Sequence, residues 1–292
     1  MWLTNNQKGL MITFFGVLLV VPDSLFVRLI SADPLITAFW RSASSGTLIL
    51  LGLLMFRGLK AFESIFQMGF RGWSYAFIIG STAPAFVFAV SKTSVANVVF
   101  ILASMPVFSA LFSYMLLKER IERRTSITIL FVILGLIVIT FGSIKSDIAS
   151  WQGDIWALYV SIAYAAALTT IRSLKSLSMI PAIPFGYIGA ALVMSFFIAP
   201  FSKFTENSFL YFQHGVLIAL GTCLLTIGPR FITSPEVALL ILLESVLAPL
   251  LVWYLLGEEP GKWALIGGFI VVSTLVISNI ILFKSKVHNQ NN

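Results

Sequence analysis

Cysteine, histidine and charged residues are scarce in this sequence of 292 residues. Its one cysteine, Cys223, has no second thiol with which to form an internal disulfide. The two histidines, His214 and His288, do not belong to a close group of histidines, cysteines and carboxylates, so no ligand set for a dedicated metal site is present. A glycine-rich phosphate loop and a G-x-S-x-G nucleophile motif are also missing. We therefore expect neither a metal nor a cofactor.

The low charge content excludes an ordinary soluble domain. Charged residues make up 11% of the chain, against roughly 25% in an average soluble protein. Hydrophobic residues make up 58%, and the mean hydropathy is +0.97. The net charge of +7 would suggest a nucleic-acid ligand in a soluble protein, but in a membrane protein basic residues follow topology and face anionic lipid head groups. We predict a polytopic membrane protein whose partner is the lipid bilayer, with no nucleic acid.

Long apolar runs are the dominant pattern, and each can supply the roughly 20 residues that a membrane-spanning helix needs. Barrel strands alternate over about 10 residues, whereas these runs are continuously apolar, so the expected fold class is an all-α bundle. We expect the first run to be retained in the protein, because it lacks the small-residue cleavage site of a signal peptide. The ten expected transmembrane helices are 9–30, 34–56, 73–91, 94–117, 124–142, 153–172, 181–200, 209–229, 234–256 and 263–283.

One motif occurs twice in the chain. Leu-Leu-Lys-Glu closes an apolar run at 116–119, and Leu-Leu-Gly-Glu closes another at 255–258, which is an offset of 139 residues. Matching apolar runs before both motifs indicate an internal duplication, with a first repeat at 1–146 and a second repeat at 147–292. Five helices per repeat is an odd number, so the second repeat starts on the opposite side of the membrane. We therefore predict two inverted repeats.

Basic residues predict the orientation, because Lys and Arg accumulate on cytoplasmic loops. With the N-terminus inside, 13 of the 19 Lys and Arg residues fall on cytoplasmic segments. We expect a multi-pass inner-membrane protein with both termini cytoplasmic and with the motif acids, Glu119 and Glu258, facing opposite compartments.

The cytoplasmic segment 57–72 has apolar residues at spacings of three and four, which predicts an interfacial amphipathic helix. The short cytoplasmic tail 284–292 is polar and is expected to be disordered.

Further short strings accompany the repeated motif. They are Pro22-Asp23-Ser24-Leu25 with Arg28, Phe39-Trp40-Arg41, Met105-Pro106 before the first motif, and Glu244-Ser245 before the second. In order and spacing the sequence resembles the EamA-type, ten-helix family of the drug/metabolite transporter superfamily over nearly its whole length. It departs from that family at Lys118, where a glycine is usual, and at Glu259-Pro260 after the second motif. The resemblance implies a permease or exporter of small organic molecules with a cavity between the repeats.

Asp23 and Arg41 are ionisable residues well inside expected helices. Such side chains must face protein or water, because exposure to lipid costs about 2.5 to 3.5 kcal/mol. Asp23 lies seven residues before the outer end of its helix and Arg41 seven residues after the outer start of the next, so both sit about 10 Å deep. We expect an ion pair that either braces an outer gate or only holds two neighbouring helices together.

Glu244 is expected near the bilayer midplane, about 15 Å deep, which is where a carrier binds its substrate. Its counterpart in the first repeat is Met105, so the acid is not part of the shared scaffold. A carboxylate at this depth can bind a substrate amine or exchange a proton, and the alternative is a bond to a neighbouring helix, at Arg41 or a serine. A cationic or zwitterionic substrate, such as an amino acid or an amine, is favoured, and neutral metabolites stay open. Uniport, exchange and proton antiport are all open as well.

Other residues give weaker indications. Pro84, Pro106 and Pro249 interrupt helices and either free backbone carbonyls for a cavity or are tolerated kinks. Asn97 is read as a hydrogen-bonding residue in helix packing or as a ligand, and His214 as an interfacial polar anchor. The aromatic residues that are candidates to line a cavity are Trp40, Tyr164, Trp253 and Tyr254.

The sequence as a whole predicts a monomeric secondary transporter that moves a small metabolite by alternating access, without chemical change. Two other classes stay open. A multispanning membrane enzyme acting on lipid would need a nucleophile, a metal or an acid/base group at the interface. A membrane sensor or structural protein would show no solute flux that depends on Glu244.

Overall fold

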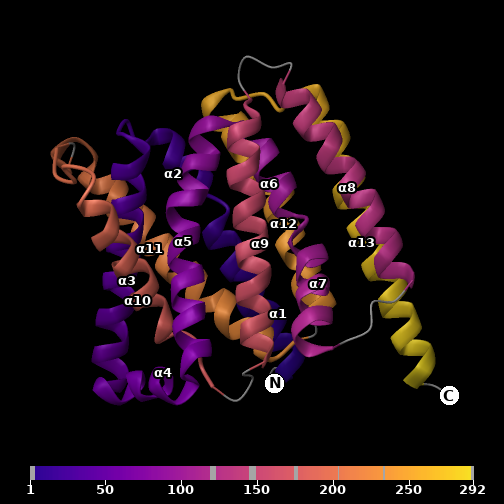
Figure 1. Cartoon of the computed structure of the whole chain (residues 1–292), viewed down its shortest axis with the longest axis horizontal. Helices are drawn as coiled ribbons and strands as arrows, with labels where there is room; N and C mark the ends of the chain where they lie inside the picture. The colour runs from indigo at the N-terminus through magenta and orange to yellow at the C-terminus, as the bar shows by residue number, and fades with distance from the viewer. Residues whose placement is uncertain are drawn as a thin grey trace.

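The computed structural model describes residues 4–118, 123–144, 149–173, 177–202, 204–232 and 234–290. Within these ranges every regular element is a helix (Figure 1), so the expected all-helical polytopic fold is confirmed. Two apolar helices are shorter than a full span, Ala182–Ser195 and Leu240–Leu256. Eight spans of the described residues are long and apolar enough to cross a membrane: Asn5–Leu29, Pro34–Arg57, Phe70–Lys92, Val95–Leu116, Thr125–Ile144, Trp151–Ile171, Phe204–Ile227 and Lys262–Ile281.

The elements follow one another along the chain with short connections. The first half contains α1 (Asn5–Val20), α2 (Asp23–Leu29), α3 (Pro34–Arg57), η1 (Leu59–Phe62), α4 (Glu63–Met68), α5 (Phe70–Lys92), α6 (Val95–Leu102), α7 (Met105–Leu117) and α8 (Arg123–Ile144). The second half contains α9 (Trp151–Ser173), α10 (Ala182–Ser195), α11 (Phe204–Ile227), η2 (Gly228–Arg230), α12 (Ser234–Leu256) and α13 (Lys262–Gln290).

Two of the expected helices are divided. The first separates into α1 and α2 at Val21 and Pro22, because proline has no amide hydrogen to donate to the preceding turn. The fourth separates into α6 and α7 at Ala103 and Ser104. Pro106 then lies in the first turn of α7, where a missing amide hydrogen removes no helical hydrogen bond. The first break matters most for the site below, because it starts α2 at Asp23.

Two segments differ from the expectations. The segment 57–72 is not one amphipathic helix, because Gly58 and Gly69 adopt φ values of 63° and 56° and separate the short elements η1 and α4 from α3 and α5. Glycine adopts this left-handed conformation without the steric cost that a Cβ atom imposes. Ile65 of α4 is fully buried in the core while Phe66 beside it is exposed. The tail that we expected to be disordered continues α13 as a helix to Gln290.

The two halves of the chain interlock in the core. α3 packs against α10 and α11, α5 against α9 and α10, and α8 against α13 (Figure 1). At the contact of α5 with α10, a Cβ atom added to Gly80 would lie 2.3 Å from the carbonyl oxygen of Gly186. Since real Cβ atoms do not approach so closely, any side chain at position 80 must push the two helices apart. Buried residues of α1, α5, α6, α9 and α12 form the main hydrophobic cluster.

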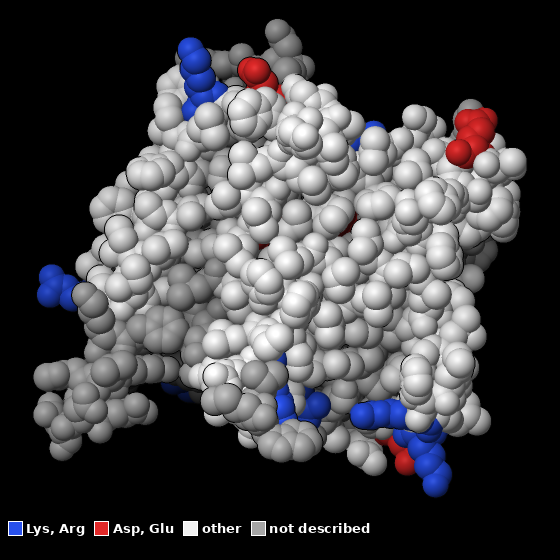
Figure 2. All heavy atoms as spheres, turned by 180° about the vertical axis from the view of Figure 1, so that it is seen from behind, with Lys and Arg blue, Asp and Glu red and all other residues white. Residues whose placement is uncertain are grey.

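The charged side chains are distributed as in a membrane-spanning bundle. They lie mainly towards the two ends of the molecule, and a broad face with few Lys, Arg, Asp or Glu side chains lies between them (Figure 2). The start of α1, the end of α13 and α4 lie at the same end (Figure 1). We call this the α4 end, and we call the end where α2 finishes the α2 end.

Candidate functional site

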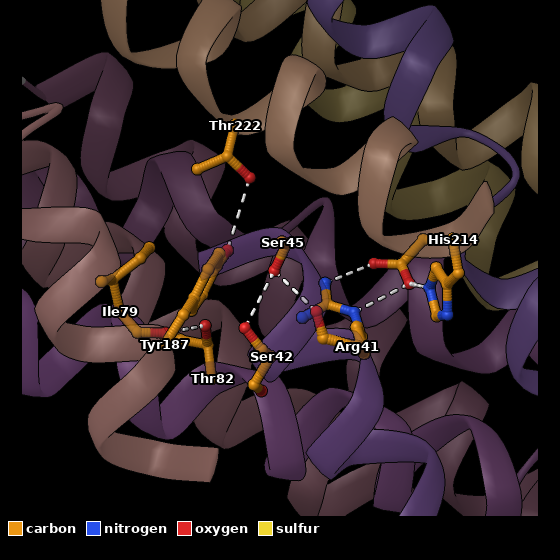
Figure 3. Close-up of polar contacts among 9 residues, drawn as sticks. Arg41, Ser42, Ser45, Ile79, Thr82, Tyr187, His214 and Thr222 are labelled. Carbon is orange, nitrogen blue, oxygen red and sulfur yellow. Dashed lines mark hydrogen bonds and ion pairs between the residues drawn. The ribbon is translucent and has the colours of Figure 1, made fainter. Parts of the chain in front are cut away.

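Three buried side chains meet inside the bundle, and we call them the Asp23 triad. Asp23 begins α2, Arg41 lies in α3 and His214 lies in α11. Arg41 donates from Nε to Oδ1 of Asp23 at 3.0 Å and from Nη2 to Oδ2 at 2.5 Å, which makes the pair bidentate. Nε2 of His214 lies 2.6 Å from the same Oδ1. Because a carboxylate can only accept, this Nε2 is the donor. Figure 3 shows the Arg41 and His214 side chains pointing towards each other, with these hydrogen bonds between them.

The triad is almost completely removed from solvent. Its exposed fractions are 3% for Asp23, 2% for Arg41 and 0% for His214. The Arg41 guanidinium lies 5.5 Å from the centroid of the Phe86 ring in α5, and the His214 ring stacks on Phe26 of α2 at 5.3 Å. A buried charge is tolerated when it is paired and hydrogen-bonded, and the triad meets both conditions. It joins three helices, two from the first half and one from the second.

Several polar atoms around the triad have no hydrogen-bond partner among the residues that the structure describes. They are Nη1 of Arg41, Nδ1 of His214 and the hydroxyl groups of Ser24, Ser42 and Tyr211. A buried donor or acceptor left without a partner costs about 1 to 3 kcal/mol. A polar ligand or bound water can satisfy such groups. The triad therefore keeps hydrogen-bonding capacity beyond its own ion pair.

Glu244 lies in α12, and its side chain is half-buried. It forms no hydrogen bond or ion pair within the described parts of the chain, yet it interacts electrostatically with Asp23 and Arg41. Its neighbour Ser245 instead donates to the carbonyl oxygen of Val99 at 3.2 Å and so ties α12 to α6. An unbonded carboxylate from the second half of the chain thus accompanies the triad.

A second polar group, the Arg28 cluster, lies at the α2 end. Arg28 near the end of α2 forms an ion pair with Glu258, which follows α12, at 2.9 Å. Arg28 also donates to the carbonyl oxygen of Thr93 at 2.9 Å. The Val95 amide, in the first turn of α6, donates to Oε1 of Glu258 at 2.8 Å. The motif acid of the second repeat thereby links the ends of α2, α5, α6 and α12.

The Arg28 cluster continues into a network around Asp154, which lies in the first turn of α9 and is buried. Asp154 accepts hydrogen bonds from Thr93 at 2.8 Å, from Asn97 at 3.1 Å and from Ser143 at 2.5 Å. Asn97 also donates to Ser143 at 2.6 Å. Asn97 is thus a hydrogen-bonding residue between α6, α8 and α9, and its amide points towards this network.

The aromatic candidates are in different environments. Trp40 donates from its indole to the carbonyl oxygen of Pro200 at 2.7 Å and stacks on Tyr211. Tyr164 packs against two hydrophobic clusters and so lies between these two parts of the core. Trp253 and Tyr254 are exposed near the end of α12, Tyr254 by 85%, at the surface of the bundle.

The proline and motif candidates are also distributed over the bundle. Pro84 and Pro249 lie inside the continuous helices α5 and α12. Pro106 lies in the first turn of α7. Glu119, the acid of the first motif, lies outside the described residues, whereas Glu258 belongs to the Arg28 cluster.

Sequence reasoning missed the roles of His214 and Asp154. His214 was expected as an interfacial anchor, but it is fully buried against Asp23. The expected helix 209–229 put His214 only five residues from its start, whereas α11 begins at Phe204 and places this residue about 15 Å along the helix. Asp154 was not counted among the buried charges because it lies only three residues after the start of its helix. Its burial depends on Thr93, which comes from a distant part of the chain.

Comparison with known proteins agrees with this architecture. The model of the EamA-like transporter family matches residues 7–141 and again residues 151–280. A Helicobacter pylori protein described as an uncharacterized transporter is 29% identical over 203 residues, which cover 64% of this chain and 66% of that protein. A Synechocystis protein, also described as an uncharacterized transporter, is 25% identical over 232 residues, which cover 74% of this chain and 66% of that protein.

A solved crystal structure has the same overall fold. It superposes with a TM-score of 0.65 at 13% sequence identity, over 94% of this chain and 97% of the solved one. The aligned part of this chain thus spans just under two thirds of each of the two relatives above, but nearly all of that structure. The double match of the family model agrees with the multiple apolar helices of a membrane-spanning protein. The chain belongs to the EamA-like transporter family.

Proposed function

We propose that the chain is a secondary transporter that moves a small organic metabolite by alternating access between two inverted five-helix repeats. The repeats are residues 1–146 and 147–292, and the ten helices include the two shorter apolar ones. The protein acts as a monomer in the inner membrane with both termini in the cytoplasm. It changes the position of its substrate and not its covalent structure, so no residue is assigned a chemical step.

The observation that carries this proposal is an unbonded acid whose charge interacts with that of a buried triad. Glu244 has no hydrogen-bond partner among the described residues, and it comes from the second half of the chain, as does His214. Asp23 and Arg41 come from the first half. A site shared by two repeats changes its access when the repeats rock against each other, which is the arrangement that a carrier needs.

The charges of the site favour an amino acid or another amine as the substrate. The Glu244 carboxylate is suited to a substrate ammonium group, because charge-assisted hydrogen bonds are about twice as strong as neutral ones. Nη1 of Arg41, which has no partner among the described residues, is suited to a carboxylate or another acceptor. A zwitterion satisfies both groups at once, whereas a simple amine satisfies only Glu244.

The Arg28 cluster is proposed as the gate at the α2 end, which lies outside in the orientation proposed above. Its ion pair between Arg28 and Glu258 is partly exposed, with 24% and 17% of the side chains accessible. A pair that is partly accessible to water costs less to separate than a fully buried pair such as Asp23 and Arg41, so this contact is the easier of the two to open. The buried ion pair between Asp23 and Arg41, by contrast, holds together α2 and α3, which both belong to the first repeat.

The test is untargeted metabolite profiling inside and outside cells that express the chain. Cells with the intact chain are compared with cells that carry Glu244→Gln at matched membrane abundance. The exposed Glu63 of α4 supplies a control, Glu63→Gln, with the same chemical change away from the site. We expect at least one amine or amino acid to accumulate outside with the intact chain and the control, but not with Glu244→Gln. Equal distribution of every solute in all three strains would contradict the proposal.

A further inference from the structure

Two adjoining cavities lie at the α4 end, apart from the Asp23 triad and the Arg28 cluster. One has a volume of about 530 Å³ and lies between α3, α11 and the segment before α10. The other, of about 430 Å³, lies between the end of α3, η1, α4 and the segment before α10. Both are lined by Arg57, Ser178, Pro181 and Arg230, so the two cavities share a wall.

The smaller cavity carries positive charge. Arg57, Lys60 and Arg230 line it together with the hydroxyl-bearing Ser64 and Ser178. None of the described residues that line either cavity is acidic. Two guanidinium groups and an ammonium group around one space are suited to a phosphate, because Arg binds its oxygens through paired N–H groups and Lys as a point charge.

The larger cavity is apolar and open to the side of the bundle. Phe56 and Leu220 line it and are 87% and 52% exposed. In a membrane-spanning protein, exposed apolar side chains of this kind contact lipid chains. Gly52 of α3 also lines the cavity, and a Cβ atom added there would meet no atom within 4 Å. The open space thus comes within reach of the α3 backbone itself.

We propose that the two cavities form a binding site for one anionic phospholipid. Its phosphate lies among Arg57, Lys60 and Arg230, and an acyl chain lies along the groove past Gly52. Charge complementarity selects this occupant, because the three cations meet no carboxylate in the cavity lining and a zwitterionic head group would bring its own cation to the site. The position also fits, since basic pockets between transmembrane helices on the cytoplasmic side bind anionic head groups. This inference is independent of the transported solute.

Native mass spectrometry of the full chain in detergent tests the charged half of the site. The probes are dioleoylphosphatidylglycerol and dioleoylphosphatidylcholine, added separately at equal concentration. We expect a one-to-one adduct with phosphatidylglycerol, and about fivefold weaker binding for each of Arg57→Gln, Lys60→Gln and Arg230→Gln, since a juxtamembrane cation contributes about that factor. Arg71→Gln removes an exposed cation of α5 that lines neither cavity, and it leaves binding unchanged. Equal adducts with both lipids, or equal loss in the Arg71 variant, would overturn the proposal.

Two glycines test the apolar half. Gly52→Phe fills the groove with a side chain that meets no neighbouring atom at its Cβ, so the fold is preserved while the acyl chain is excluded. Gly189→Phe is the matched control, because a Cβ atom at Gly189 of α10 is equally free and this residue lines neither cavity. We expect loss of the lipid adduct in the first variant alone. Full retention in Gly52→Phe, or displacement of the lipid by inorganic phosphate alone, would show that no acyl chain occupies the groove.

Discussion

Replacing Asp23 by asparagine is expected to destabilise the protein strongly. The substitution keeps the size of the side chain but removes the charge that faces Arg41, whose side chain is 2% exposed. The guanidinium is then buried without a counter-ion, and it also loses a bidentate contact with distances of 3.0 and 2.5 Å. Breaking a buried ion pair in this way costs about 3 to 5 kcal/mol, most of which is the uncompensated charge.

A double-mutant cycle separates the pair from its members. Arg41→Met alone leaves the Asp23 carboxylate with only His214 as a partner, so its cost is similar in size. The double variant Asp23→Asn with Arg41→Met removes both charges, and it is expected to be more stable than either single variant. Exchanging the two residues is expected to restore less stability than the double variant does, because His214 would then donate towards a guanidinium instead of a carboxylate.

The measurement is reversible unfolding in mixed detergent micelles, followed by helical circular dichroism. The expected coupling energy between positions 23 and 41 is at least about 2 kcal/mol, which is well above the additivity error of roughly 0.5 kcal/mol for independent sites. The reasoning would be refuted if the stability loss of the double variant equalled the sum of the losses of the two single variants. A cost below about 1 kcal/mol for Asp23→Asn would also contradict it, because that value is typical of an exposed pair.

Three further predictions follow from other contacts. Gly80→Leu is expected to abolish folding, measured as loss of monodisperse protein on size exclusion, because even its Cβ atom would lie 2.3 Å from the carbonyl oxygen of Gly186; normal elution would contradict this. Glu258→Ala is expected to leave stability within about 1 kcal/mol but to speed deuterium exchange of the Val95 amide, which loses its acceptor; unchanged exchange would argue against the gate. Asp154→Ala is expected to cost about 3 kcal/mol of unfolding free energy, because three buried donors lose their acceptor; a loss below 1 kcal/mol would contradict it.

The fold class was predictable because it depends on local composition. Continuous apolar runs require helices in a membrane, and the repeated motif indicates two similar halves. The breaks were harder to predict, since Pro22 divides α1 from α2 whereas Pro84 and Pro249 remain inside continuous helices. Whether a proline ends a helix depends on which neighbouring groups satisfy the freed carbonyls, and this is set by tertiary packing. The inverted relation of the repeats stays a prediction.

The candidate site was predictable to the extent that depth along a helix is predictable. Equal depth placed Asp23 opposite Arg41, and the structure has them in direct contact. His214 was placed too near a helix end because its expected helix began at residue 209. Its rotation about α11, which decides whether it faces lipid or Asp23, depends on the neighbouring helices. The Arg28 cluster joins residues more than 160 positions apart, so no local sequence pattern predicts it.

The most direct test of the central claim is solute uptake by the purified protein in proteoliposomes, with Glu244→Gln compared with the intact chain. The solute is the amine or amino acid identified by metabolite profiling, and Glu63→Gln serves as the control. The account predicts that Glu244→Gln either raises the substrate concentration for half-maximal uptake or slows uptake, by at least about tenfold. This factor corresponds to 1.4 kcal/mol of lost interaction, and the control transports normally. Uptake by Glu244→Gln that equals that of the intact chain would contradict the account.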